Sequence, residues 1–389
     1  MQKKYLGLLF VIMFLMMLGF GMIIPILPYF AESVGASSLE IGLLFSSYNI
    51  MQFLFAPIWG ALSDRIGRKP LIMLGLSGFA IAFILFGLST SYSEMLAYRL
   101  FGGIVSAAAI PTVTAMVADL FPPDERAKGM GVIGAGIGLS FVFGPAIGGL
   151  LGQYGAGYPF FAAGAVALLT LLLVIVSLPE SLPPEKRSHV QREKRDNPLT
   201  ALFGSLALLY HIVFIVSFTF AGLETTFALY INDLYGLTAK ELGYMFLVMG
   251  IIAAIVQGGM IGRMVKKWGE ANVLSIGLLL YALGFISILL ADSFWGFALN
   301  LSLFGAGQGM IRASATSLIT QRTTQGQGVT SGTMSSIDSL GRILGPLAGG
   351  ALYAWTKSGP FLLGFVLIMV VLILFRGRNL YSLKQTETH

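Results

Sequence analysis

Two ionisable residues lie inside long apolar stretches of the chain, where a charged group is costly. Glu224 lies within the stretch 201–231 and has no basic residue within one helical turn. Apolar surroundings favour the neutral form of a carboxyl group, so we expect Glu224 to bind and release a proton near physiological pH. Arg99, in the stretch 94–118, does not lose its proton and must therefore be paired or face water. These residues predict proton or cation chemistry, with a structural hydrogen-bonding role as the alternative for Glu224.

Five further charged residues occur in or beside apolar stretches. Asp338 and Arg342 are four residues apart, so on a helix they can form a pair that neutralises both charges. Arg312 is a candidate for a charge in a polar cavity. Asp119 and Asp292 lie near the ends of their stretches, where we expect solvated side chains.

Residue patterns typical of enzymes and metal sites are missing from the sequence. The chain has no cysteine, and His189, His211 and His389 are too scattered to suggest a metal site. No HExxH, Walker A, CxxC or nucleophile-elbow pattern occurs. We therefore expect no enzyme activity, no metal and no cofactor.

The elements that must position these residues are membrane-spanning helices. Of 389 residues, 56% are hydrophobic and only 11% are charged, which is too few charges for the surface of a soluble protein. Many apolar stretches approach the roughly 20 residues that cross a bilayer as a helix. Dividing the chain at charged, proline, glycine and polar clusters predicts twelve spans. Their limits are 5–30, 41–62, 70–90, 94–118, 127–151, 158–178, 201–231, 240–263, 271–291, 294–318, 326–353 and 357–376.

The basic residues predict the orientation of these spans. Nineteen Lys and Arg residues occur in the termini and in the loops assigned to one side of the membrane, against only Lys240 and Lys357 on the other. Because basic loops stay in the cytoplasm, we expect a multi-pass protein of the cell inner (plasma) membrane with both termini cytoplasmic. The same distribution explains the net charge of +6 without a nucleic-acid partner.

Matching segments in the two halves of the chain predict an internal repeat. GPAIGG at 144–149 and GPLAGG at 345–350 are offset by 201 residues, and LFGG of the fourth span recurs as LFGA in the tenth. We therefore expect an all-α membrane protein with two six-helix bundles related by pseudo-two-fold symmetry. The expected domains are an N-terminal bundle at 1–178, a cytoplasmic linker at 179–200, and a C-terminal bundle with a short cytoplasmic tail at 201–389.

Three motifs carry a resemblance to a known family. The first is GALSDRIGRK, residues 60–69, between the second and third spans. The second is Arg99 followed by Gly102 and Gly103, and the third is the Gly-Pro-x-x-Gly-Gly of span five. With them, the chain resembles the major facilitator superfamily over essentially its whole length, and in particular the twelve-helix drug:proton antiporter branch. The segments GFGMIIPILP and GLETTFALY are similar to parts of Gram-positive multidrug exporters and tetracycline exporters.

The resemblance implies a role for the loop between spans two and three. In the family this loop is a latch that steadies one conformation and releases in the other. We expect its acidic residue to meet the positive N-terminal end of a helix and its basic residues to meet carboxylates or lipid headgroups. An anchor that only orients the protein in the membrane is the alternative. The expected latch residues are Gly60, Asp64, Arg65, Gly67, Arg68 and Lys69.

The resemblance also implies antiport rather than symport, through the motif of span five. From the residues alone, this motif predicts a proline kink and close helix contact. The chain departs from the family pattern at Ser140, where Gly is usual, and at Gly309, where related exporters often have an acidic residue. The departure at Gly309 leaves the number of protons per cycle open. The motif residues are Gly144, Pro145, Gly148 and Gly149.

Aromatic and polar residues near these charges predict the kind of substrate. Tyr48 and Gln52 share one face of span two, and Phe220 and Phe227 share a face of span seven with Glu224. Aromatic rings beside a carboxylate suit flat or cationic amphipathic compounds. The predicted substrate-binding residues are Tyr48, Gln52, Phe141, Phe220, Phe227, Gln308 and Arg312, and the predicted proton-coupling residues are Glu224 and Arg99.

Together these features predict a proton-coupled antiporter that exports small amphipathic or cationic compounds by alternating access, as in multidrug efflux. Its partners would be the small-molecule substrate, protons and membrane lipids, and we expect a monomer. Two alternatives remain open. One is an exporter of a single drug class such as tetracycline, and the other is a symporter or importer of small organic solutes.

Overall fold

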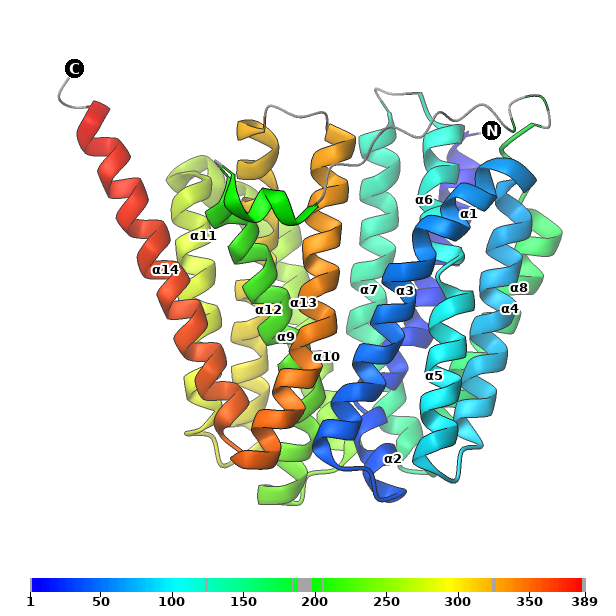
Figure 1. Ribbon diagram of the computed structural model, residues 1–389, viewed down its shortest axis with the longest axis horizontal. Helices are drawn as coiled ribbons and strands as arrows, with labels where there is room; N and C mark the ends of the chain where they lie inside the picture. Colours follow the sequence, from blue (N-terminus) through cyan, green and yellow to red (C-terminus); the bar gives the residue numbers. More distant parts are fainter. Residues whose placement is uncertain are drawn as a thin grey trace. The chain divides into compact units, whose positions relative to one another are not determined.

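The computed structural model describes residues 2–122, 125–183, 185, 187, 198–204, 206–323 and 327–386. All regular elements in these ranges are helices (Figure 1). The chain divides into two compact units, which we call unit 1 and unit 2. Unit 1 comprises Met1–Glu193 and Ile231–Tyr244, and unit 2 comprises Lys194–Tyr230 and Met245–His389. Each unit is described by itself.

The first part of the chain forms eight helices, all in unit 1. They are α1 (Gln2–Ile23), α2 (Leu27–Ser33), α3 (Ser38–Ile66), α4 (Arg68–Gly87), α5 (Tyr92–Ser106), α6 (Ala109–Leu120), α7 (Arg126–Gly152) and α8 (Tyr158–Ser177).

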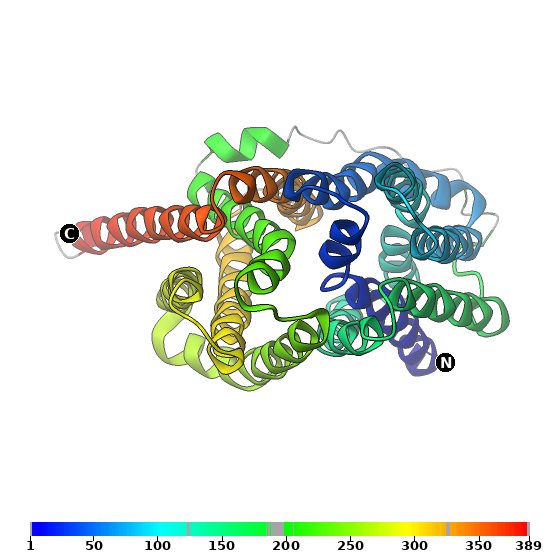
Figure 2. The same cartoon turned by 90° about the horizontal axis from the view of Figure 1, so that it is seen from below.

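The second part begins with a short 3-10 helix, η2 (Pro198–Phe203), and continues with long helices. They are α9 (Ala207–Tyr235), α10 (Ala239–Ile255), the π-helical turn η3 (Val256–Met260), α11 (Ile261–Ile288), α12 (Phe294–Arg322), α13 (Gln327–Trp355) and α14 (Gly359–Thr386). The predicted twelfth span ends at 376, but α14 continues to Thr386, and Figure 2 shows its C-terminal part extending away from the rest of unit 2.

The twelve predicted spans each correspond to one helix or to one interrupted helix, which confirms the predicted fold class. Span one is broken between α1 and α2, and span four between α5 and α6. Prolines explain both breaks. Pro25 lies in the first break, Pro28 lies in the first turn of α2, and Pro111 lies in the first turn of α6. Each lacks an N–H, and in an unbroken helix its ring would clash with the carbonyl four residues earlier. Spans eight and nine run on through η3, with a non-helical residue, Gly269 (φ 76°), where the predicted loop between them lies.

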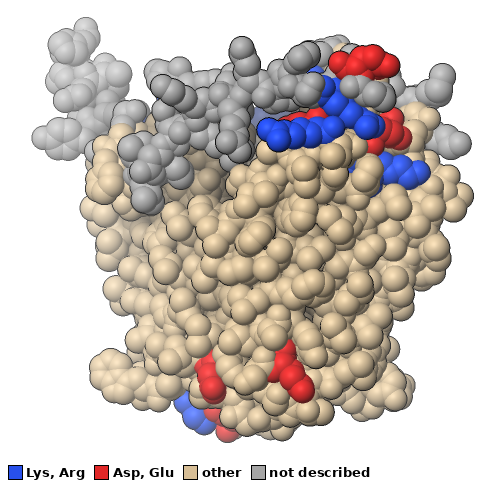
Figure 3. Space-filling model, turned by 45° about the vertical axis from the view of Figure 1, so that its right-hand side comes forward, with Lys and Arg blue, Asp and Glu red and all other residues tan. Residues whose placement is uncertain are grey.

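The apolar character of these helices fits a membrane. Nine segments of the described chain are long and apolar enough to span one, and the segment Ala239–Ile288 among them covers two predicted spans. Helices α12 and α13 are not in this group because they carry polar residues such as Asn300, Asp338 and Arg342. On the face shown in Figure 3, the charged side chains gather at the two ends and leave an uncharged band between them.

The glycine motif of span five is a helix contact. In unit 1, a Cβ atom added to Gly144 of α7 would lie only 2.9 Å from the Cα of Gly21 in α1. A Cβ at Gly148 would overlap the carbonyl oxygen of Met22. The absence of side chains therefore lets α1 and α7 pack backbone to backbone, as small residues do in membrane helices. This confirms the close contact that the sequence predicts.

The same contact recurs in unit 2 at the predicted offset of 201 residues. A Cβ added to Gly349 of α13 would lie 2.9 Å from the Cα of Gly222 in α9, and one added to Gly222 would lie 3.2 Å from the carbonyl oxygen of Gly345. Pro346 lies inside α13 as Pro145 lies inside α7. The internal repeat is therefore a repeat of helix packing as well as of sequence.

Candidate functional site

A cluster of one arginine and two acids lies inside unit 2, between α9 and α13. The Nη1 atom of Arg342 is 4.0 Å from Oε2 of Glu224, and its Nε atom is 3.3 Å from Oδ2 of Asp338. The hydroxyl of Ser217, on α9, donates a hydrogen bond to the other oxygen of Asp338. We call these residues, Glu224, Asp338, Arg342 and Ser217, the acid cluster. Its arginine is shared between two carboxylates.

Close packing of α9 and α13 brings the acid cluster together. Gly341 presents no side chain to α9, and a Cβ added there would lie 2.8 Å from the carbonyl oxygen of Phe214. Gly345 lies one turn further on, and a Cβ added there would lie even closer, overlapping the carbonyl oxygen of Phe218. At this separation the side chains of Asp338 and Arg342 reach residues of the neighbouring helix.

The acid cluster is dry at one end and accessible at the other. The Glu224 side chain is 9% exposed, whereas those of Arg342 and Asp338 are 30% and 37% exposed. Tyr281 of α11 is fully buried on the inner side and donates a hydrogen bond to the carbonyl oxygen of Val216. The cluster can therefore exchange protons or cations through its open end while Glu224 stays largely shielded from water.

The structure confirms one sequence prediction here and corrects another. The expected pair between Asp338 and Arg342 is present. The sequence predicts no basic neighbour for Glu224, which is true within its own helix, but Arg342 approaches it from α13. The sequence does not predict this contact because Glu224 on α9 and Arg342 on α13 are far apart along the chain. Ser217 is a member of the cluster that sequence reasoning missed.

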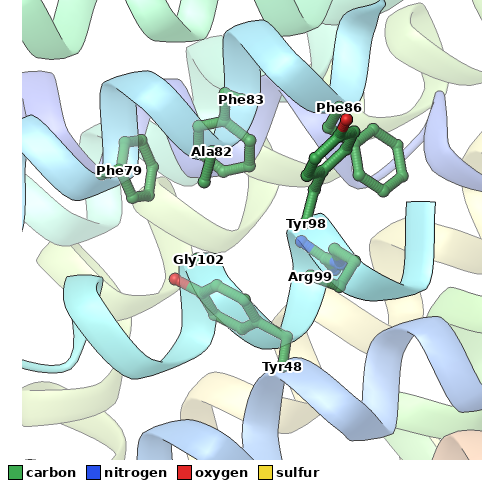
Figure 4. Close-up of a pocket in the computed structure, with 8 residues that line it drawn as sticks. All are labelled: Tyr48, Phe79, Ala82, Phe83, Phe86, Tyr98, Arg99 and Gly102. Atoms are coloured by element: carbon green, nitrogen blue, oxygen red, sulfur yellow. The ribbon is translucent and has the colours of Figure 1, made fainter. Parts of the chain in front are cut away.

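An arginine in surroundings of a different kind is buried in unit 1 (Figure 4). Arg99 of α5 is 4% exposed, and its Nε donates a hydrogen bond to the carbonyl oxygen of Leu44 at 3.3 Å. Its guanidinium lies over the rings of Tyr48, Phe45 and Phe86, at 4.7, 5.8 and 5.9 Å from the ring centroids. The described residues place no carboxylate within 4.0 Å of it. Arg99 is thus paired with aromatic faces rather than with an acid.

The predicted pair of Tyr48 and Gln52 lies beside Arg99. The Tyr48 hydroxyl is 2.8 Å from the Ser106 hydroxyl, and the Gln52 amide donates to both, at 3.1 and 3.0 Å. These polar groups satisfy one another and fix the Tyr48 ring under the guanidinium. Their role in binding substrate stays a prediction.

The remaining predicted substrate-binding residues are spread over three helices. Phe227 of α9 is fully buried and packs edge to face on Phe297, with centroids 5.9 Å apart, and Phe220 of the same helix is also buried. Phe141 of α7 and Gln308 of α12 are half-buried, and Arg312 of α12 is exposed. Arg312 is close enough to Asp338 to interact with its charge. Substrate contacts at these five positions stay predictions.

The predicted latch is an ion-pair network at the turn from α3 to α4. Only Gly67 separates the two helices, and its φ of 113° is a conformation that suits glycine. Arg68 lies 2.6 Å from Asp64 and 2.9 Å from Asp119. The prediction that Asp119 is merely solvated is wrong, because Arg68 reaches it from the neighbouring helix. Gly60 and the exposed Arg65 take no part in these ion pairs.

A residue that sequence reasoning missed occupies the start of α4. The Glu180 carboxylate accepts hydrogen bonds from the backbone N–H groups of Arg68 and Lys69, at 2.9 and 3.1 Å. The sequence predicts that Asp64 meets such a helix end, but Glu180 takes this place. The predicted linker therefore starts bound to the turn, and Leu182 is buried. Its residues 188–197 lie outside the described residues, and the predicted domain limits stay a prediction.

Known proteins are similar to this chain over nearly its whole length. The model of the Major Facilitator Superfamily matches residues 9–271 and 258–387. "Multidrug resistance protein 2" of Bacillus subtilis (strain 168) is 34% identical over 95% of this chain and 94% of its own length. "Quinolone resistance protein NorA" of Staphylococcus aureus is 27% identical over 99% of both chains.

Solved structures with similar folds are also transporters. The human organic anion transporter MFSD10 (TETRAN) superposes with a TM-score of 0.70 and 29% identity, over 96% of this chain and 99% of that one. The nucleoside transporter NupG gives a TM-score of 0.77 over 96% of this chain and 98% of that one, at 14% identity. The second likeness shows the fold alone.

Proposed function

Because the chain belongs to the major facilitator superfamily, we propose that it is an antiporter that exports small amphipathic or cationic compounds in exchange for protons. The names of its bacterial relatives support this assignment, since they denote multidrug and quinolone resistance. The acid cluster has the charged groups that an exchange of protons for cationic compounds requires.

The observation that carries the proposal is the charge balance of the acid cluster. Two carboxylates share one guanidinium, so the three groups hold one unbalanced negative charge when both acids are ionised. One proton on Glu224 or one cationic substrate beside it restores the balance. Binding a proton and a cationic substrate together would leave the cluster with one unbalanced positive charge. Exclusive occupancy of this kind is what antiport requires, and it follows from the positions of three side chains.

The contacts of Arg342 depend on whether Glu224 is ionised or protonated. When Glu224 is ionised, the guanidinium is divided between two acids. When Glu224 is protonated, Asp338 retains the guanidinium, because its contact with Arg342 is already the shorter one and Ser217 holds its other oxygen. Substrate would therefore bind from the cytoplasmic side to ionised Glu224, and a proton arriving from outside would replace it.

The energy of one proton is sufficient for export of this kind. A membrane potential of 100 mV is worth about 2.3 kcal/mol per charge. Each pH unit across the membrane adds about 1.4 kcal/mol. With both contributions, one proton therefore sustains a gradient of roughly two to three orders of magnitude for a neutral compound, since about 1.4 kcal/mol corresponds to a factor of ten. A monovalent cation exchanged for one proton draws on the pH difference alone.

Other expectations extend this proposal. Arg99 would take part in coupling as a fixed positive charge, because a guanidinium stays protonated. The Arg68 network would act as the latch, opening as the transporter changes conformation. We further propose that the protein is a monomer of the plasma membrane with both termini in the cytoplasm, in contact with lipid and without a nucleic-acid partner or a cofactor.

Uptake of ethidium into inverted membrane vesicles tests the proposal. With the vesicle interior made acidic, an exporter coupled to protons accumulates the dye, whereas a symporter loses it. Replacing Glu224 with Gln is expected to lower gradient-driven uptake at least about tenfold, the effect of losing roughly 1.4 kcal/mol of differential binding. Glu185→Gln is the matched control, because Glu185 is exposed and far from the cluster in sequence. Undiminished uptake in Glu224→Gln contradicts the assignment.

A further inference from the structure

Three basic side chains near the start of α11 have no ionic partner among the described residues. Arg263, Lys266 and Lys267 are exposed, and the ion pairs found in the described parts of the chain all lie elsewhere. Trp268 follows them and is also exposed, with its ring centroid 5.8 Å from the Nζ atom of Lys267. We call these four residues, Arg263, Lys266, Lys267 and Trp268, the basic patch.

The acids of the neighbouring helices do not balance the charge of the basic patch. Glu270 is the only acid in the sequence of α11, and α12 and α14, which pack on α11, have none. The Glu270 carboxylate accepts hydrogen bonds from Gln321 and Ser317 of α12, at 3.0 and 3.3 Å. Even when Glu270 is counted against the three cations, two positive charges are in excess.

The turn from α3 to α4 in unit 1 provides a comparison, because both turns contain a glycine with a positive φ. In unit 1, Arg68 follows this glycine and pairs with Asp64, which lies three residues before it. In unit 2 the charges are exchanged, since Glu270 follows the glycine and Lys266 lies three residues before it. Lys266 and Glu270 are not among the ion pairs of the described residues. The cations of this turn are therefore available to a partner outside the protein.

Exposed apolar side chains lead along the same helix face to the basic patch. Ile251 and Ile255 of α10 are four residues apart, and both are exposed. The π-helical turn η3 inserts one extra residue, so the exposed Met260, five residues further on, continues this face. Arg263 and Lys267 follow at spacings of three and four residues, which keep them on it. We call Ile251, Ile255 and Met260 the apolar stripe.

We infer that the basic patch binds the headgroup of an anionic phospholipid, whose acyl chains lie along the apolar stripe. The guanidinium of Arg263 matches two phosphate oxygens, and the two lysines add point charges. The indole of Trp268 suits the boundary between membrane and water. A zwitterionic lipid brings its own cation and would leave the excess charge in place. A headgroup with a net negative charge, such as phosphatidylglycerol, is therefore the better match.

This inference rests on the membrane location of the protein and not on the proposed exchange of protons for substrate. The basic patch and the apolar stripe share no residue with the acid cluster. Lipid binding can be measured without a proton gradient, so its failure would leave the proposed function untouched, and loss of export in Glu224→Gln would leave lipid binding unchanged.

Thermal unfolding of the full-length protein in detergent micelles tests the inference. We expect dioleoyl phosphatidylglycerol to raise Tm by a few degrees (~2–4 °C) at concentrations well above its dissociation constant, because a ligand that binds only the folded state stabilises it. Dioleoyl phosphatidylcholine, which has the same acyl chains, and soluble glycerol 1-phosphate should each give less than half of this shift. An equal shift with either of them, or no shift with phosphatidylglycerol, overturns the assignment to an anionic lipid.

A pair of double variants locates the binding. Arg263→Gln/Lys267→Gln is expected to raise the phosphatidylglycerol concentration needed for the half-maximal shift at least about tenfold, because each basic residue near an anionic headgroup contributes to binding. Arg322→Gln/Arg376→Gln is the matched control, since it removes two exposed cations from α12 and α14 of the same unit, and it should keep the wild-type response. An unchanged response in the first variant, or an equal loss in both, contradicts the site.

Single variants keep the inference testable if the double variant does not fold. Arg263→Gln and Lys267→Gln each change one exposed side chain, and such substitutions have little effect on stability. Each is expected to raise the phosphatidylglycerol concentration at half-maximal shift at least about threefold. A wild-type response in both single variants also contradicts the site.

Discussion

Two arginines in membrane-spanning helices of this transporter occupy opposite kinds of environment. Arg342 lies between two carboxylates and is 30% exposed, whereas Arg99 lies among three aromatic rings and is 4% exposed. The charge of Arg342 can be redistributed when a neighbouring acid takes up a proton. The charge of Arg99 has no titratable acid beside it among the described residues and stays where it is. An arginine in a membrane helix is therefore a switch or a fixed charge according to its neighbours.

The internal repeat sharpens this contrast. The packing glycines recur at the offset of 201 residues, so Gly21 and Gly144 correspond to Gly222 and Gly345. At the same offset, Glu224 corresponds to Ile23 and Arg342 to Phe141. The two halves thus share the contact that holds their helices together but differ in the charges placed beside it. The acid cluster is a feature of one half only.

The largest effect is expected from removing the arginine that is shared. Arg342→Gln leaves Asp338 and Glu224 without their cation, and removing one partner of a buried pair costs about 3–5 kcal/mol. The lower end applies because Arg342 is partly exposed. We expect gradient-driven ethidium uptake to be lost and Tm to fall. The double variant Asp338→Asn/Arg342→Gln should recover most of the lost Tm, because it restores the charge balance.

The same change at the other arginine provides the comparison. Arg99→Gln removes a charge that has no acid partner among the described residues, so its effect on Tm should be small or favourable. Equal destabilisation by Arg99→Gln and Arg342→Gln would break the distinction between the two sites.

A smaller effect is expected from Asp338→Asn. Without the second acid, the whole charge of Arg342 acts on Glu224 and stabilises its ionised form. Protonation of Glu224 then requires a more acidic solution. We expect the pH profile of ethidium uptake to move to lower pH by about one unit, which corresponds to roughly 1.4 kcal/mol. Asp292→Asn, at an exposed position, is the control, and a profile that stays in place or moves to higher pH contradicts the shared-arginine mechanism.

The smallest effect on transport is expected from the packing glycines. Gly345→Ala and Gly144→Ala each place a methyl group against the backbone of the neighbouring helix, and overpacking typically costs about 1–3 kcal/mol. Both should therefore lower Tm, and Gly345→Ala should lower it more, because its Cβ would overlap the carbonyl oxygen of Phe218, whereas that of Gly144→Ala would lie 2.9 Å from the Cα of Gly21. Only Gly345→Ala should also change the pH profile of uptake, because α13 carries the acid cluster. A changed profile in Gly144→Ala instead would show that the two contacts are not separate.

Features that depend on local sequence were predictable. Apolar stretches located the spans, and the spacing of four residues correctly predicted the pair of Asp338 and Arg342. The breaks in spans one and four were not predicted, although their prolines, Pro25, Pro28 and Pro111, are visible in the sequence. A proline can either bend or break a membrane helix, depending on what its neighbours can bond to.

Features that depend on contacts between distant helices were not predictable from one sequence. Nothing near Glu224 in the sequence indicates Arg342, and nothing near Arg68 indicates Asp119 or Glu180. The glycines of α13 are the one signal that could have helped. Their spacing marks the helix face that approaches another helix most closely, and Asp338 and Arg342 lie along its edge.

The hydrogen bonds of Glu180 have a mechanical consequence. They tie the chain leaving α8 to the first turn of α4, so the segment that leads on to η2 is attached at this turn as well as at the end of α8. The entropy lost when the two ends of a connecting segment are held together depends only weakly on the number of residues in the segment. Its point of attachment matters more, since any pull along the chain is applied directly to the turn that carries Arg68. Ser181, the residue after Glu180, also donates a hydrogen bond to Asp119, so a pull along the connection would act on both Glu180 and Asp119, the acids that it joins to Arg68.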